Sequence, residues 1–166
     1  MSTRKISIYG LLVALAMVLS WIESRFGFTM MVPGMKLGLT NLVVLLALYK
    51  IGYKDAIIIN FIRILLVSMT FGNMFSFFYS LAGGLLSGIV MIILKKTDKV
   101  NLITVSVMGG IFHNVGQILV AMVVMNTVHI AYYLAVLWVS GIVAGVIIGI
   151  LSAQIVRRIP ELGIEK

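Results

Sequence analysis

Residues Val32–Asn41 read VPGMKLGLTN and interrupt a chain that is otherwise mostly apolar helix. Pro33 lacks a backbone N–H and Gly34 readily adopts positive φ, so we do not expect a helix to continue through this pair. Lys36 then adds a charge beside an apolar segment. Irregular backbone next to a membrane persists only where protein or a water-filled cavity covers it. We therefore interpret the stretch as a lid over a ligand cavity, with a plain connecting loop and a solvated Lys36 as the alternative.

The composition indicates a membrane protein. Of 166 residues, 61% are hydrophobic and only 11% are charged, whereas soluble domains carry about a quarter charged residues. Because a membrane-spanning helix needs about 20 residues, the chain has room for at most about seven spans. We expect a single transmembrane domain over residues 1–166. The apolar run that follows Arg4 and Lys5 has the form of a signal peptide, but we interpret it as a retained first helix.

Apolar segments separated by polar turns predict a compact all-α bundle of six membrane helices. Their expected ranges are 6–22, 41–49, 56–70, 74–94, 102–125 and 130–156. Ten of the 13 Lys and Arg residues fall on the side of the two termini, whereas only Arg25 and Lys36 fall on the other side and Arg63 lies within a helix. The positive-inside rule therefore predicts cytoplasmic termini and an external VPGMKLGLTN stretch. The net charge of +8 thus reflects loop residues that orient the chain and does not indicate a nucleic-acid partner.

Small residues recur four apart on several predicted helices, which lets helices approach closely in lipid. The stripes are Gly141, Gly145 and Gly149 in the last helix, Ser80, Gly84 and Gly88 in the fourth, and Gly10 and Ala14 in the first. We expect most of them to be contacts inside the bundle. The face of Gly10 and Ala14 is the predicted docking surface for a partner membrane subunit, with the Gly141 stripe as the next candidate.

A few polar side chains are expected near the middle of the membrane, where charges are costly and usually functional or paired. Asn60 and Arg63 share a face of the third helix, and the fifth helix carries His113, Asn114 and Gln117. We expect Glu23 at an outer helix end and no carboxylate at the depth of Arg63, so that an anionic ligand would balance its charge. The predicted substrate-binding residues are Lys36, Asn41, Asn60, Arg63, His113, Asn114 and Gln117, and the predicted lid residues are Pro33, Gly34 and Gly38. In the alternative, backbone carbonyls and Asn114 or Gln117 satisfy a structural Arg63.

Several chemistries are excluded by residue types that the chain lacks. Cysteine is absent and there are only five carboxylates, no two of them clustered, so a magnesium–diphosphate site cannot be assembled. The sequence has no phosphate-binding loop for ATP hydrolysis, and its two distant histidines make a poor metal site. We therefore expect no enzymatic activity, no metal and no cofactor.

Three motifs resemble a known family: PGMKLGLTN at 33–41, SLAGGLLS at 80–87 and GIFHNVGQ at 110–117. They resemble small bacterial membrane proteins labelled heptaprenyl diphosphate synthase component I or Gx transporter. Those proteins are similar in size and span number to the substrate-binding S components of energy-coupling-factor (ECF) importers. The resemblance implies a multi-pass protein of the bacterial cell membrane, with an outward-opening cavity under the first outer loop. It also implies docking through small residues of the first helix onto an energy-coupling transmembrane subunit that carries two ATPases.

Two functions follow as hypotheses. The first is an S-component-like importer subunit that binds a small anionic, vitamin-like or precursor-like molecule. The second is a non-catalytic membrane partner of a polyprenyl diphosphate synthase or of a quinone-pathway enzyme. The first helix offers only Gly10 and Ala14 as a minimal docking stripe.

Overall fold

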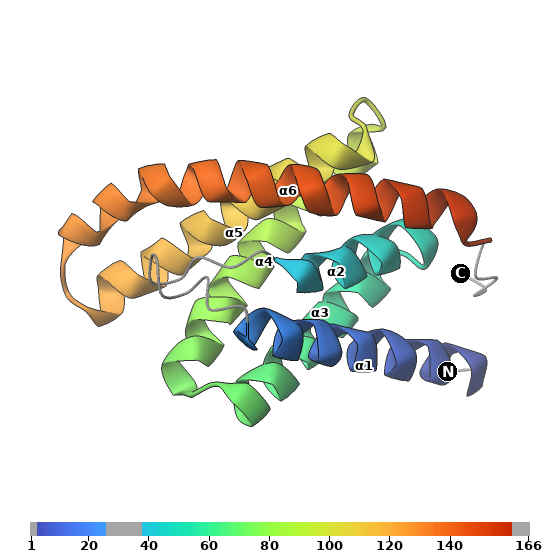
Figure 1. Ribbon diagram of the computed structural model, residues 1–166, viewed down its shortest axis with the longest axis horizontal. Helices are drawn as coiled ribbons and strands as arrows, with labels where there is room; N and C mark the ends of the chain where they lie inside the picture. Colours follow the sequence, from blue (N-terminus) through green and yellow to red (C-terminus); the bar gives the residue numbers. More distant parts are fainter. Residues whose placement is uncertain (1–2, 26–37, 161–166) are drawn as a thin grey trace.

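The computed structural model describes residues 3–25 and 38–160, and within them it is helical without any strand (Figure 1). The six predicted helices are confirmed, with the last one preceded by a short 3-10 helix, η2. Their bounds are α1 Thr3–Arg25, α2 Leu39–Lys50, α3 Tyr53–Phe71, α4 Met74–Thr97, α5 Leu102–Val124, η2 Val128–Tyr132 and α6 Tyr133–Arg158. The sixth helix was expected to begin at 130, but residues up to Tyr132 form the tighter 3-10 turn.

The helices begin where the sequence supplies a suitable cap. The side chains of Asn73 and Asn101 accept hydrogen bonds from Ser76 N (2.8 Å) and Thr104 N (2.8 Å) at the starts of α4 and α5, satisfying backbone donors that the first turn leaves open. Gly38 precedes α2 with φ 71°, a left-handed conformation that glycine adopts without penalty. As the sequence suggested, α2 therefore begins within the VPGMKLGLTN stretch.

Glycines bring α4, α5 and α6 into close contact, and these are the most extensively packed neighbours in the fold (Figure 1). A Cβ added at Gly116 of α5 would lie 2.6 Å from the Ala82 carbonyl oxygen of α4, and one added at Gly145 of α6 would lie 2.6 Å from Val107 Cα of α5. The stripe of Gly141, Gly145 and Gly149 thus faces α5. Its expected role inside the bundle is confirmed, and its use as a reserve docking surface is wrong because the face is already occupied.

The short helix α2 forms the centre of the other half of the molecule. Residues 43–48 of α2 are all buried, and the residues that pack around them come from α1, α3, α4, α5 and α6. The outer surface of α1, by contrast, is uncovered. Its buried residues Tyr9, Val13 and Ala16 face the core, while Gly10 and Ala14 lie on the exposed side.

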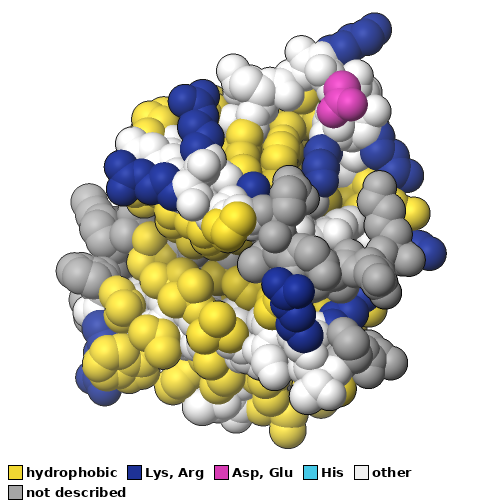
Figure 2. All heavy atoms as spheres, turned by 90° about the vertical axis from the view of Figure 1, so that its right-hand side faces the viewer, with side chains coloured by type: hydrophobic (Ala, Val, Ile, Leu, Met, Phe, Trp, Pro, Cys, Tyr) yellow, Lys and Arg dark blue, Asp and Glu magenta, His cyan; other side chains and the backbone are white. Residues whose placement is uncertain are grey.

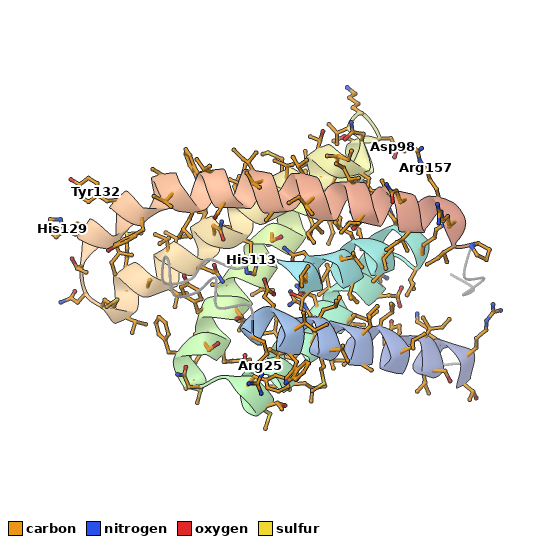
Figure 3. All side chains as sticks on the ribbon, in the orientation of Figure 1. Arg25, Asp98, His113, His129, Tyr132 and Arg157 are labelled. Atoms are coloured by element: carbon orange, nitrogen blue, oxygen red, sulfur yellow. The ribbon has the colours of Figure 1, made fainter. Side chains whose placement is uncertain are left out.

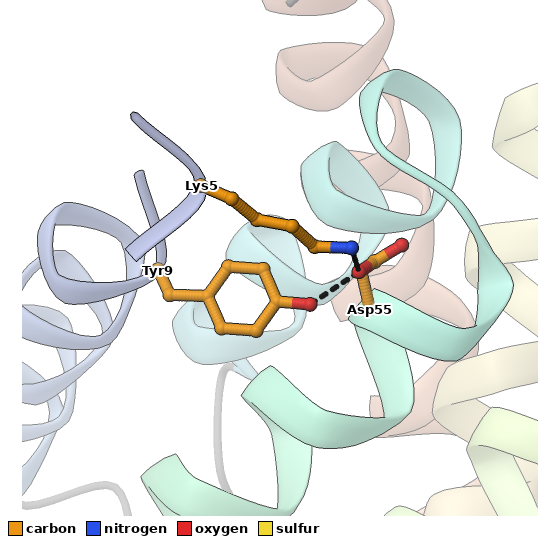
Figure 4. A network of polar contacts seen from close by, with 3 residues as sticks. All are labelled: Lys5, Tyr9 and Asp55. Atoms are coloured by element: carbon orange, nitrogen blue, oxygen red, sulfur yellow. Dashed lines mark hydrogen bonds and ion pairs between the residues drawn. The ribbon is translucent and has the colours of Figure 1, made fainter. Parts of the chain in front are cut away.

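A polar cluster fixes the beginning of α1 to the beginning of α3. The Lys5 ammonium forms an ion pair with the Asp55 carboxylate, and the Tyr9 hydroxyl donates a hydrogen bond to the same carboxylate oxygen (Figure 4). At the end of α4, Lys95 lies over the Tyr49 ring and donates to the Leu48 carbonyl, and Lys96 lies over the Tyr53 ring. The beginnings of α1 and α3 and the ends of α2 and α4 therefore meet at one end of the bundle.

Most of the helical surface is suited to lipid. Within residues 3–25 and 38–160, four helical segments are long and apolar enough to cross a membrane, namely Thr3–Glu23, Met74–Thr97, Leu102–Val124 and Val128–Arg158, and α2 is a shorter apolar helix. Figure 2 looks onto the end where α1 begins and α6 finishes, and Lys and Arg side chains surround apolar side chains there. Figure 3 places His129 and Tyr132 at the opposite end from Asp98 and Arg157. This is a membrane protein in which most of the basic helix ends gather on one side, with Arg25 at the end of α1 as an exception.

The orientation in the membrane stays a prediction that cysteine labelling can test. The chain has no natural cysteine, so single substitutions Lys96→Cys and His129→Cys give unambiguous labels. We expect a membrane-impermeant maleimide to label position 129 in intact cells and position 96 only after the cells are opened, because the basic end should face the cytoplasm. Labelling of position 96 from outside would contradict this orientation.

Candidate functional site

A cavity of about 250 Å³ lies among all six α-helices. Its wall is rich in hydroxyl and amide groups, which is unusual inside a bundle of such apolar helices. The polar lining residues are Ser20, Glu23, Thr40, Asn41, Arg63, Ser68, Ser76, Ser80, Ser106, His113 and Asn114. A concave space with a few convergent polar groups is the usual form of a small-molecule site, although this one lies below the common volume range of about 300–1,000 Å³.

Arg63 of α3 is the central cation of this cavity and is only 7% exposed. Its Nε donates to Asn60 Oδ1 (2.9 Å) and its Nη1 donates to Thr40 Oγ1 (2.8 Å). Asn60 in turn donates from Nδ2 to the Gly84 carbonyl oxygen (3.1 Å), which connects the group to α4. A guanidinium has five N–H donors, so these contacts orient the fork of Arg63 and leave further donors for the cavity.

A carboxylate shares the cavity with Arg63, contrary to expectation. Glu23, at the end of α1, lines the same cavity, and its negative charge lies close enough to attract the guanidinium. The Gly38 N–H donates to Glu23 Oε1 (2.6 Å), so the start of α2 holds the carboxylate in place. The expectation that no carboxylate reaches Arg63 was wrong because it placed Glu23 by its distance along α1, without the contact between the end of α1 and the start of α2.

Two of the three site residues predicted on α5 line the cavity, and the third does not. His113, near the centre of Figure 3, and Asn114 both line the cavity. Asn114 donates from Nδ2 to the Leu137 carbonyl oxygen of α6 (2.6 Å), which fixes its amide. Gln117 lies outside the cavity wall and is 0% exposed, with its Cγ against Gly83 of α4. Neither amide is a hydrogen-bond partner of Arg63, whose partners are Thr40 and Asn60.

Only the last part of the predicted lid lies within the described residues. Gly38 and Asn41 line the cavity, whereas Pro33, Gly34 and Lys36 lie outside the described residues. Thr40 and the serines of the wall were missed by sequence reasoning. Isolated hydroxyl residues are common in apolar helices, and only the packing of several helices brings these together.

The described part of the chain contains no group of three His, Asp or Glu side chains arranged to hold a metal ion.

The two predicted docking residues on the first helix, Gly10 and Ala14, lie on its exposed face, and a Cβ added at Gly10 would meet nothing within 4 Å. This face is thus open to a neighbouring helix.

The comparisons with known proteins identify a family. The family model described as heptaprenyl diphosphate synthase component I matches residues 12–155, a range that includes every residue that lines the cavity. No curated protein and no solved structure matches the chain. The match extends over most of the sequence and names a family that the three sequence motifs resemble, so this chain belongs to the heptaprenyl diphosphate synthase component I family.

Proposed function

We propose that the protein is a substrate-binding membrane subunit, similar to an S component of an ECF importer, for a small molecule with an anionic group. The observation that carries this proposal is the buried Arg63, whose fork is oriented by Thr40 and Asn60 toward a cavity between membrane helices. A guanidinium binds a carboxylate or phosphate through two parallel hydrogen bonds. Other polar side chains around it, including Asn41, His113 and Asn114, would select the rest of the ligand.

The proposed role is capture of the substrate without chemistry. Among the described residues, Glu23 is the one carboxylate in the cavity wall, and no second carboxylate accompanies it as a general acid–base pair or a metal ligand would require. Energy for transport would come from an energy-coupling transmembrane subunit and two ATPases. No cofactor is needed for this role.

A second candidate function is favoured by the description of the family. A "component I" of heptaprenyl diphosphate synthase implies another component, so the protein would be a non-catalytic membrane partner of that synthase. Affinity purification from the native membrane in mild detergent separates the two proposals. We expect a transmembrane coupling protein and ATPases among the co-purified proteins, whereas recovery of a soluble prenyl synthase alone would favour the second function.

The exposed face of α1 provides a test of how an importer would assemble. We predict that Gly10→Leu or Ala14→Leu abolishes binding of the coupling subunit, because a bulky side chain prevents close approach of two helix backbones in lipid. Ligand affinity should stay unchanged, since neither residue lines the cavity. Co-purification measures the first effect and equilibrium ligand binding the second. Complexes that persist in both variants would exclude this face as the interface.

A further inference from the structure

A second hollow of about 300 Å³ lies between α3 and α4, with two residues of α2 behind it. Its lining is an apolar side chain or glycine at every position except Asn60. Ile57, Phe61 and Ile89, which line the hollow, are each about half exposed. In a membrane protein such a surface faces hydrocarbon, so this apolar groove opens toward the bilayer.

Two glycines of α4 shape the groove in different ways. A Cβ added at Gly88 would meet nothing within 4 Å, so the missing side chain leaves real space along the groove. A Cβ added at Gly84 would lie 2.6 Å from Ile64 Cδ1, so Gly84 allows α3 to approach α4 at one end of the groove. The groove is thus open at Gly88 and closed by side chains at Gly84.

That closed end separates the groove from the polar cavity by a single layer of side chains. Ile64 lines both hollows. Asn60 lines the groove and accepts the hydrogen bond from Nε of Arg63, which lines the cavity (2.9 Å). The guanidinium lies directly behind Ile64 and Asn60, so these two side chains must change rotamer to admit a head group from the groove.

We propose that the groove binds the hydrocarbon chain of a single-chain anionic amphiphile whose head group binds Arg63. The proposal rests on the proposed function and specifies the substrate class of that same site. The apolar groove leads from the lipid to a wall of two side chains with a buried cation directly behind it, and an amphiphile with one chain and one anionic head matches both parts. The groove, at about 300 Å³, is too small for both chains of a phospholipid, and a purely apolar partner helix would leave the buried cation unmatched.

Photocrosslinking tests this assignment. The protein is reconstituted in phosphatidylcholine nanodiscs and exposed to dodecyl phosphate that carries a diazirine at its chain end, and the crosslinked residues are mapped by mass spectrometry. We expect labelling to concentrate on α3 and α4 at the groove, on residues such as Ile57, Phe61 and Ile89. Gly88→Leu should reduce this labelling about tenfold, since a few methylene groups decide affinity in an apolar pocket. Gly10→Leu is the matched control, because a Cβ there also meets nothing within 4 Å.

Each result of the photocrosslinking experiment either supports or overturns the proposal. Even labelling of all lipid-facing helices, unchanged by Gly88→Leu, overturns the proposal, as does an absence of label in the groove. Loss of label with Gly88→Leu but not with Arg63→Ala overturns the pairing of chain and head group. Competition by unlabelled dodecyl phosphate or farnesyl phosphate supports the proposal. The relative strength of the two competitors shows whether the groove prefers a straight or an isoprenoid chain. Binding of radiolabelled methyl phosphate, which has no long chain, tests Arg63 alone, so that the proposed function can hold even if the groove assignment fails.

Discussion

Arg63→Ala is expected to weaken binding of an anionic ligand by about 1.5–3 kcal/mol, the usual contribution of a hydrogen bond to a charged group, or roughly 10- to 150-fold in Kd. Arg63 is the cation in the cavity wall whose fork is held by two side chains, so its geometry is fixed before the ligand arrives. Arg63→Lys should restore little, because an ammonium keeps the charge but loses the planar pair of donors. Equilibrium binding of radiolabelled methyl phosphate to the protein in nanodiscs measures both effects.

Two further variants test whether the loss of anion affinity is specific to Arg63. Ile59→Val changes a fully buried residue one turn away on α3 and should leave affinity nearly unchanged. Glu23→Gln removes the negative charge that shares the cavity, so anion affinity should rise. If Arg63→Ala binds the anion as tightly as the natural protein, Arg63 is structural and its bonds to Thr40 and Asn60 are its whole role. If Glu23→Gln weakens anion binding, Glu23 holds the ligand or the start of α2 and does not compete for Arg63.

The helices were predictable because each one is an apolar run bounded by polar turns, glycine or an asparagine cap. Asn73 and Asn101 are local signals, and each caps its helix in the structure as a local rule requires. The position of Arg63 near the middle of α3 was also predictable, since it follows from the rise per residue of a helix. These features depend on neighbours within a few positions of the chain.

The composition of the cavity was less predictable because it depends on contacts between distant segments. Glu23 belongs to the site only because the backbone N–H of Gly38 binds its carboxylate, and Thr40 only because α2 begins beside α3 and offers its hydroxyl to Arg63. Gln117, by contrast, was predicted in the site but lies outside the cavity wall. Its spacing from His113 placed it on the same face, but the close approach of α4 at Gly83 covers it. Helical periodicity identifies a face and does not identify which helix will cover it.

Packing by glycine is the feature with the largest expected effect on stability. We predict that Gly116→Ala lowers the free energy of unfolding by about 1–3 kcal/mol, the usual cost of overpacking. The added methyl group would lie 2.6 Å from the Ala82 carbonyl oxygen and 2.9 Å from Gly83 Cα. These are backbone atoms of α4, which cannot rotate away as a side chain does, so α4 and α5 must separate. Circular dichroism during thermal unfolding in detergent measures the loss.

Gly88→Ala is the matched control within the same helix pair. A Cβ at Gly88 meets nothing within 4 Å, and alanine is favoured over glycine inside a helix by up to about 1 kcal/mol. The two substitutions add the same methyl group to neighbouring helices, so helix propensity raises stability in both and only the contact differs. We therefore expect Gly88→Ala to melt at or above the temperature of the natural protein and Gly116→Ala well below it. Equal melting temperatures for the two variants would mean that α4 and α5 are not held in backbone contact. The gain in helix propensity from glycine to alanine would then explain the stability of both variants.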